Sequence, residues 1–327
     1  MKAAPRISVL MSVQDGAYLR PAVETLLAQT LRDAEFVLVD DASEPDTAAL
    51  LEAYARDEPR VRLVRLRRSA GLAAALNEGL AACRAPLVAR ADADDEYAPE
   101  RLARQAAVMD ARPALGVLSC GYERIDGAGR RVGALTPVTG PRRLAFRQLF
   151  QNQLLHPGTM FRSDLIRSVG GYDPAFWTAQ DSDLWARLLP LTEIDNLPDR
   201  LVRWRRHGRS VLASRGAAGA ALSASVSQRL LADYLGEPVT EDAAAAAVAV
   251  WRSTGRQPPA TLALGLRLLA RIRAEARVRG EPSVHRDLTA KVGVSLARQA
   301  ARHAHRAPLQ AGRIAALATG WTHGAVR

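Results

Sequence analysis

The chain has 327 residues, of which 48% are hydrophobic and 24% charged, and its formal net charge is +11. This composition is typical of a folded soluble protein with one large domain, or one large and one smaller domain. No run of about 18 apolar residues occurs, which excludes a membrane span, and the start MKAAPRISVLMSV does not have the pattern of a signal peptide. Cys83 and Cys120 lack metal-ligand spacing, so we expect a reducing compartment, the cytoplasm.

Strand-like and helix-like segments alternate through the first 125 residues. The strand-like segments are unbroken apolar runs rather than alternating ones, as burial on both faces of a sheet requires. Segments with helical spacing separate them, so the pattern predicts an α/β fold with a mostly parallel sheet and helices on both faces. The predicted strands are 6–13, 34–43, 61–66, 85–95 and 115–126, and the predicted helices are 18–30, 47–57, 71–83 and 99–113.

The pattern changes in the second half of the chain. DGAGRR, at 126–131, is typical of a hairpin turn, and residues 211–327 are rich in Ala and Arg with helical periodicity broken at GEP, GRQPP, RGEP and RAP. We therefore expect an α/β domain at 1–212 and a basic helical region at 213–327. From residue 215 onward, 16 Lys and Arg residues accompany 7 Asp and Glu residues. Such a surface suits an anionic partner, or it reflects solvated arginines on helices.

Acidic residues follow the second and fourth predicted strands. Asp40 and Asp41 end one, and Asp92, Asp94 and Asp95 end the other. In an α/β sheet ligands bind beyond the carboxyl ends of the strands, so both clusters should line one crevice. Oxygen ligands without nearby His or Cys suit a hard divalent cation, Mg²⁺ or Mn²⁺. The chain has neither a P-loop nor a dinucleotide-binding glycine motif, which excludes a P-loop NTPase and a dinucleotide dehydrogenase.

Eight segments in order resemble family 2 glycosyltransferases with a GT-A fold. They are SVLMSVQDGAYLRPAVETLLAQT, FVLVDDAS, SAGLAAALNEGL, PLVARADADD, HPGTMFR, VGGYDP, QDSDLWARL and WRRHGRSV, within residues 6–212. The resemblance implies inverting, hexosyltransferase-like transfer of a sugar from a nucleotide diphosphate sugar to an acceptor hydroxyl. It also suggests a role in the synthesis of a cell-surface polysaccharide or glycolipid.

The resemblance implies roles for residues of the donor site. Ser12 would border the nucleotide, and Asp40 or Asp41, with Asp41 preferred, would bind the base. Asp92 and Asp94 match the Asp-x-Asp motif, with Asp94 as the direct metal ligand and Asp92 nearer the ribose.

The resemblance also implies roles for residues beyond position 150. Asp181 matches the catalytic base, although its position alone favours a helix N-cap. His207 would lie near the diphosphate, and His156 near the donor sugar or acceptor. Trp177 could be an acceptor platform or part of the core. We expect Asp183 to be structural. Arg203, Arg205 and Arg206 could reach phosphates or line a solvated strand edge.

The chain departs from the family pattern at two places, and two other functions stay open. Gln14-Asp15 replaces Tyr-Asn, which removes an aromatic that could stack on the base, and Gln180 stands where Glu is commoner. A sugar-phosphate nucleotidylyltransferase would share the sheet, but it needs a glycine-rich, basic first loop. A non-catalytic nucleotide-sugar-binding scaffold is the other alternative. Expected partners are the sugar donor, a saccharide or lipid-linked acceptor and an anionic membrane face, but no nucleic acid.

Overall fold

The computed structural model of the chain describes residues 4–208, 216–253, 255–304 and 307–322. The chain divides into two compact units. The first comprises Met1–Leu144 and Gln153–Ala220, and the second comprises Ala145–Asn152 and Ala221–Arg327. The boundary that the sequence places between residues 212 and 213 lies outside the described residues.

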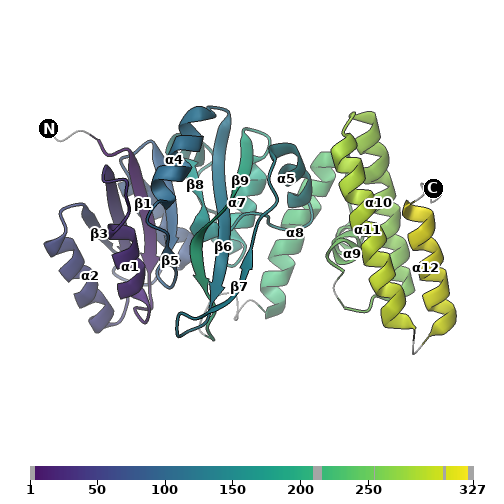
Figure 1. The fold of residues 1–327 in the computed structure, drawn as a ribbon, viewed down its shortest axis with the longest axis horizontal. Helices are drawn as coiled ribbons and strands as arrows, with labels where there is room; N and C mark the ends of the chain where they lie inside the picture. Colours follow the sequence, from purple (N-terminus) through teal and green to yellow (C-terminus); the bar gives the residue numbers. More distant parts are fainter. Residues whose placement is uncertain (1–3, 209–215, 254, 305–306, 323–327) are drawn as a thin grey trace. The chain divides into compact units, whose positions relative to one another are not determined.

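A nine-stranded sheet forms the centre of the first unit (Figure 1). Its order is β3-β2-β1-β4-β8-β6-β9-β5, with β7 beside β6. β3, β2, β1 and β4 run parallel, whereas β8 lies antiparallel between β4 and β6. The predicted α/β class is confirmed, with a mixed sheet. The strands are β1 Ile7–Val13, β2 Ala34–Asp40, β3 Val61–Arg65, β4 Leu87–Asp92, β5 Glu96–Tyr97, β6 Leu115–Ile125, β7 Arg131–Leu135, β8 Met160–Arg162 and β9 Glu193–Arg205.

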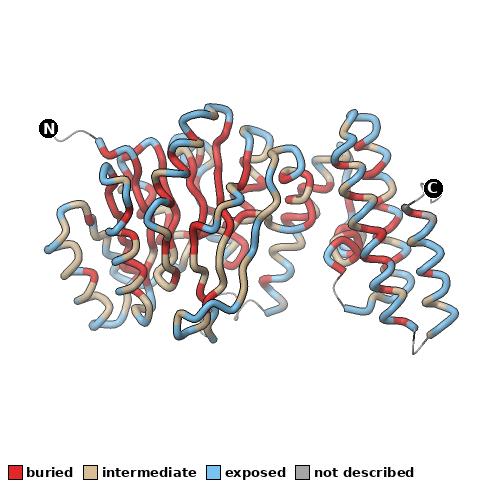
Figure 2. The backbone as a smooth tube through the Cα atoms, viewed as in Figure 1, coloured by how far each residue is buried: buried red, intermediate tan, exposed pale blue. Residues whose placement is uncertain are grey.

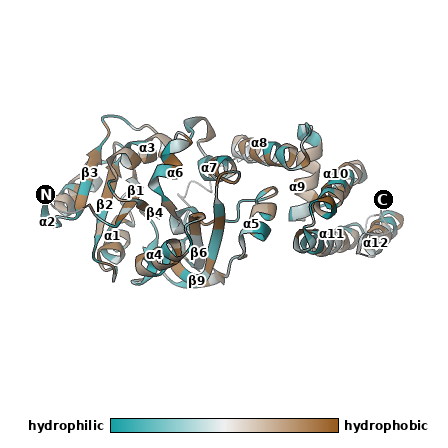
Figure 3. Ribbon diagram, turned by 90° about the horizontal axis from the view of Figure 1, so that it is seen from above, coloured by the Kyte–Doolittle hydropathy of each residue, from teal (hydrophilic) through white to brown (hydrophobic). Residues whose placement is uncertain are grey.

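Helices cover both faces of this sheet (Figure 3). Because successive side chains of a strand point to opposite faces, Val9 and Met11 of β1 pack with α1, α2 and α4, while Leu10 packs with α3, α6 and α7. Burial on both sides explains why the strands are continuous apolar runs (Figure 2). The helices of this unit are α1 Leu19–Leu27, α2 Pro45–Asp57, α3 Leu72–Ala82, α4 Arg101–Ala111, η1 His156–Gly158, α6 Ser163–Ser168, η2 Pro174–Phe176 and α7 Gln180–Leu188. α5 Pro141–Gln148 begins in this unit and ends in the second.

A buried carboxylate fixes the register of β1, β2 and the chain entering β4. Glu35 accepts hydrogen bonds from Ser8 Oγ at 2.6 Å and from the backbone N–H and Nε of Arg84, each at 2.8 Å. Burial alone would raise the pKa of Glu35, but these hydrogen bonds outweigh it and lower the pKa. β1 is thus tied, near its amino end, to the two strands that carry the acidic clusters, β2 and β4.

Glu35→Gln is expected to lower the free energy of unfolding at pH 7 by about 1–3 kcal/mol, because a buried charge-assisted hydrogen-bond network loses its acceptor. Because the pKa of Glu35 is lower in the folded than in the unfolded protein, its ionised form stabilises the fold at pH values above the unfolded pKa of about 4.3. This stabilisation is lost as the pH falls through the folded pKa. The difference between variant and wild type should therefore shrink from pH 7 to pH 3.5 in urea unfolding. An equal difference at both pH values would contradict this account.

The second unit is helical. Its helices are α8 Gly216–Leu235, α9 Glu241–Arg252, α10 Pro259–Val278, α11 Pro282–His303 and α12 Pro308–Thr322, separated at the predicted Gly and Pro breaks. The segment 145–152 packs within this unit: Phe150 stacks on Trp251 at 4.4 Å between ring centroids, and Arg147 forms an ion pair with Asp287. None of the helices in the described ranges is both long enough and apolar enough to cross a bilayer.

Candidate active site

The carboxyl ends of β2, β1 and β4 bring the acidic clusters to one edge of the sheet. In the parallel register, Ser12 lies opposite both Val39 and Asp92, and Val13 lies opposite Asp40. Ser12, Asp40 and Asp92 therefore stand at nearly the same level on three adjacent strands. This is the convergence that the strand-end positions predict.

Asp40 and Asp41 hold the loops at this edge. Asp40 accepts hydrogen bonds from the backbone N–H and hydroxyl of Ser43, at 2.9 and 2.6 Å. Asp41 accepts from the backbone N–H groups of Ala70 and Gly71, at 2.7 and 3.2 Å, and from the Ser69 hydroxyl at 3.1 Å. Asp41, which sequence reasoning preferred as the residue that binds the base, thus fixes the loop that leads into α3. Its contact with the base stays a prediction.

The loop held by Asp41 is also linked to the loop after β1. Gln14 donates a hydrogen bond from Nε2 to the Ser69 hydroxyl at 3.2 Å. Sequence reasoning treated Gln14 only as the loss of an aromatic residue. In the structure this residue joins two loops that border the predicted nucleotide pocket.

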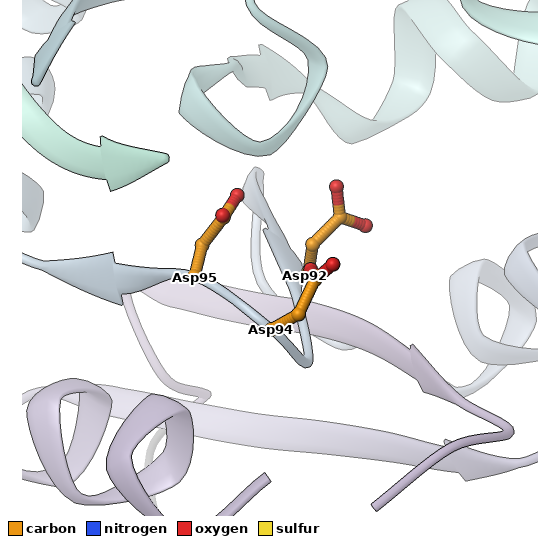
Figure 4. Close-up of side chains that lie close together, drawn as sticks. All are labelled: Asp92, Asp94 and Asp95. Carbon is orange, nitrogen blue, oxygen red and sulfur yellow. The ribbon is translucent and has the colours of Figure 1, made fainter. Parts of the chain in front are cut away.

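Three carboxylates converge on the turn after β4 (Figure 4). One oxygen each of Asp92, Asp94 and Asp95 lies within 4.8 Å of the others. Burial, followed by the charge of Asp92, raises the pKa of Asp94; burial, followed by Asp94 and Asp92, raises that of Asp95 well above its ordinary value. Asp95 accepts from the Arg205 backbone N–H at 2.7 Å, but its buried Oδ2 has no hydrogen-bond partner among the described residues.

This cluster fits a divalent cation. Mg²⁺ and Mn²⁺ prefer oxygen ligands such as carboxylates. The three carboxylates repel one another, and a cation between them would remove that repulsion and bind the buried oxygen that has no partner among the described residues. Sequence reasoning assigned Asp92 and Asp94 to the metal. The structure adds Asp95 to the group, and its position directly after Asp94 was the available signal.

Two buried arginines frame the carboxylates. Arg90 forms an ion pair with Asp92 and also donates to the Ala91 carbonyl. Arg205, with a side chain that is 4% exposed, donates from Nε to the Asp94 carbonyl at 2.9 Å and forms an ion pair with Glu96. The alternative that Arg205 lines a solvated strand edge is wrong, because its side chain is buried and β9 lies between β6 and β5. A phosphate contact of this residue stays a prediction.

His207 lies against the acidic cluster. Its Nε2 is 2.9 Å from Asp94 Oδ2, and its ring centroid is 5.0 Å from that of Tyr18. Tyr18 also lies under the Arg205 guanidinium, at 4.5 Å. The structure therefore brings His207 to the carboxylates, where a role near a diphosphate is chemically reasonable. Sequence reasoning missed Tyr18, which follows the first loop without any distinguishing pattern.

Asp181 lies in the first turn of α7 and is 7% exposed. Its Oδ1 accepts the Ser182 backbone N–H at 2.8 Å. The N-cap of α7 is Ala179, so the alternative that Asp181 is an N-cap is wrong. A carboxylate inside the first turn is stabilised by the positive end of the helix dipole, which keeps it available as a proton acceptor.

Tyr172 is a buried phenol that lies against His156. Its Oη lies 3.0 Å from His156 Nε2, and the Asn77 side chain bonds both the N–H and the carbonyl of Tyr172, at 2.8 and 2.7 Å. Burial raises the pKa of Tyr172, and the charges of Asp181 and Asp92 raise it further. The contact between Tyr172 and His156 was not indicated by the sequence.

The helix of Asp181 also braces the loop before Tyr172. Asp183 is buried and forms an ion pair with Arg187 at 2.8 Å, and Arg187 donates to the carbonyls of Val169 and Gly171, at 2.6 and 2.8 Å. Gly171 has φ +73°, and an added Cβ would lie 2.5 Å from Asn77 Oδ1, so only glycine fits. Asp183 is structural, as expected.

Residues 8–168 match the glycosyl transferase family 2 domain. The chain is 32% identical over 200 residues to the amylovoran biosynthesis glycosyltransferase AmsE of Erwinia amylovora, covering 61% of this chain and 74% of AmsE. It is 32% identical over 236 residues to the O-antigen biosynthesis protein RfbC of Myxococcus xanthus, covering 71% of this chain but only 18% of RfbC.

A solved structure has the same fold. The mannosyltransferase PcManGT of Pyrobaculum calidifontis, in complex with GDP-Man and Mn²⁺, aligns with a TM-score of 0.55 and 20% identity, covering 98% of this chain and 84% of that one. Together, the sequence match and the arrangement of strands and helices establish the family. The chain belongs to glycosyl transferase family 2 and has the GT-A fold.

Proposed function

We propose that this glycosyltransferase moves a sugar, with inversion, from a nucleotide diphosphate sugar to an acceptor hydroxyl. The observation that supports this most is the convergence of Asp92, Asp94 and Asp95 at the end of β4, where one oxygen of each lies within 4.8 Å of the others. A cation-binding cluster and a proton acceptor on one pocket are what such a transfer needs. Only one carboxylate is required beside the acceptor, whereas a glycosidase requires a facing pair.

The chain's residues have separate tasks in this mechanism. Asp92 and Asp94, joined by Asp95, would hold Mn²⁺ or Mg²⁺, and a cation bound there neutralises charge on the diphosphate. His207 lies beside Asp94, where it can contact the leaving group. Arg90 holds the Asp92 carboxylate through an ion pair.

Asp181 carries out the proton transfer. One carboxylate oxygen of Asp181 takes the proton of the acceptor hydroxyl as the hydroxyl oxygen attacks the anomeric carbon of the donor sugar. The new carbon–oxygen bond forms on the face opposite the diphosphate, the old bond to the diphosphate oxygen breaks, and its electron pair leaves with the nucleotide. The Ser182 N–H holds the other oxygen of Asp181 throughout.

The names of the two relatives support a biosynthetic role. AmsE is named for amylovoran biosynthesis and RfbC for O-antigen biosynthesis. We therefore place this chain in the synthesis of a cell-surface polysaccharide or glycolipid, with a saccharide or lipid-linked acceptor.

The decisive experiment is a donor screen. We expect Mn²⁺-dependent release of nucleoside diphosphate from at least one of a panel of UDP-sugars and GDP-sugars, with EDTA abolishing it. As a control, nucleoside triphosphate plus sugar 1-phosphate should release no pyrophosphate. Pyrophosphate release without donor cleavage would favour the nucleotidylyltransferase alternative. Metal-dependent donor binding without any cleavage would favour the scaffold.

The basic helical unit also suggests a peripheral contact with an anionic membrane at the cytoplasmic face. At the end of α10, Val278 is 82% exposed between the exposed Arg277 and Arg279. An apolar side chain between cations suits an anionic lipid surface. We expect flotation with phosphatidylglycerol vesicles and not with phosphatidylcholine vesicles, and Arg277→Glu should reduce it. Absence of flotation with both kinds of vesicle would refute the contact.

A further inference from the structure

An exposed apolar segment leads into the helix of Asp181. Trp177 is 49% exposed, whereas Trp185, Trp251 and Trp321, elsewhere among the described residues, are buried. Pro174 and Ala175, just before it, are exposed as well. The alternative that Trp177 belongs to the core is therefore wrong. An indole left open to solvent four residues before the proposed base is a candidate ligand contact, because Trp offers a large apolar face and a polar N–H.

This segment is held in a defined conformation. Asp173 caps it by accepting the Ala175 N–H at 2.9 Å, the Phe176 N–H bonds the Asp173 carbonyl at 3.1 Å, and the Ala179 N–H bonds the Phe176 carbonyl at 3.0 Å. α7 begins directly afterwards, with Asp181 four residues beyond Trp177. The backbone that carries the indole is thus fixed relative to the start of α7, and little backbone ordering would be required on binding.

Two buried polar side chains within three residues of Trp177 have an atom that lacks a hydrogen-bond partner among the described residues. In the described part of the chain, nothing bonds Thr178 Oγ1 or Gln180 Oε1, although these residues are 0% and 5% exposed. Buried polar atoms are nearly always paired in native proteins, so each unpaired one requires an explanation. A ligand that carries several hydroxyl groups would supply the missing donors.

The charge of the segment argues against an anionic acceptor. Residues 173–181 contain two carboxylates, Asp173 and Asp181, and no Lys, Arg or His. A phosphate group placed against Asp181 would meet like charge without a nearby cation from this segment. A neutral, hydroxyl-bearing molecule with one apolar face meets no such penalty.

We propose that Trp177, Thr178 and Gln180 form an acceptor subsite for a pyranose, whose apolar face stacks on the indole. The acceptor class is therefore a saccharide hydroxyl and not a lipid phosphate. This inference rests on the proposed function, because the subsite delivers the hydroxyl to Asp181. The proton passes to Asp181 as the glycosidic bond forms and the donor diphosphate leaves.

The test compares transfer with hydrolysis. The cleavable donor and either a panel of methyl pyranosides or citronellyl phosphate are given to wild type, Trp177→Ala and Trp177→Phe. The control is Leu191→Ala, which also removes an exposed apolar side chain of the first unit. We expect wild type to glycosylate at least one pyranoside. Trp177→Ala should lower the ratio of transfer to donor hydrolysis about tenfold, Trp177→Phe should lower it less, and the control should match wild type. Binding is followed independently through the indole NMR resonance of Trp177, assigned by its loss in Trp177→Phe.

The outcomes distinguish a failure of the acceptor subsite from a failure of the proposed glycosyltransferase function. Perturbation of the Trp177 resonance by the accepted pyranoside, with the expected ratios, supports the subsite. Donor hydrolysis with transfer only to citronellyl phosphate, or an unchanged ratio in Trp177→Ala, overturns the subsite and leaves the glycosyltransferase intact. Failure of wild type to cleave any donor overturns both.

Discussion

Asp181→Asn should lower kcat for transfer by about 10²–10⁴-fold while leaving donor affinity nearly unchanged. The amide has the shape of the carboxylate, and its carbonyl can still accept the Ser182 N–H that Asp181 accepts at 2.8 Å. What it loses is the capacity to take a proton. The loss should therefore appear in kcat and not in the dissociation constant of the nucleoside diphosphate, measured by calorimetry in the presence of Mn²⁺.

Asp183→Asn is the matched control, because this carboxylate lies on the same helix two residues away. It is buried and paired with Arg187, so its removal breaks an ion pair that braces the loop before Tyr172. We expect a lower Tm and a kcat per folded molecule within about tenfold of wild type. Should Asp181→Asn keep wild-type kcat, another group must accept the proton and the proposed mechanism is wrong.

The sequence predicts the frame of this site well because its signals are local. Unbroken apolar runs identified β1, β2 and β4. Because parallel strands bring their carboxyl ends to one edge of the sheet, the acidic residues at the ends of β2 and β4 predicted the position of the pocket. The Gly and Pro breaks likewise separated the helices of the second unit. Each of these inferences needs only neighbouring residues and one general rule.

Contacts between distant parts of the chain are not predicted in this way. Arg205 lies 111 residues from Asp94, and its alternation with Trp204 and Arg203 is typical of a solvated strand edge. Only the position of β9 between β6 and β5 buries it. The engagement of Asp41 by the loop before α3, and the contact of His156 with Tyr172, are similar cases. In all three the chemistry of the residue was visible, but its partner was not.

Asp94→Asn should reduce Mn²⁺-dependent donor cleavage by about 10³-fold, because cation stabilisation of a leaving group contributes several kcal/mol and each 1.36 kcal/mol is a factor of ten. The same variant without metal should be at least as stable as wild type. Burial and Asp92 raise the pKa of Asp94, so its ionised form is disfavoured in the folded state and destabilises the apo protein as the pH rises through that value. An amide at this position removes that repulsion.

The loss of charge repulsion and the loss of cation binding shift the Tm of Asp94→Asn in opposite directions relative to wild type. With EDTA at pH 7.5, Asp94→Asn should melt at or above the wild-type temperature. With Mn²⁺, wild type should gain Tm, and gain more at pH 7.5 than at pH 5.5, since protons must leave the carboxylates before a cation binds. Asp94→Asn should gain little at either pH, whereas the exposed control Asp164→Asn should follow wild type. A wild-type Tm that is indifferent to Mn²⁺ at both pH values would show that Asp92, Asp94 and Asp95 converge for a reason other than a cation.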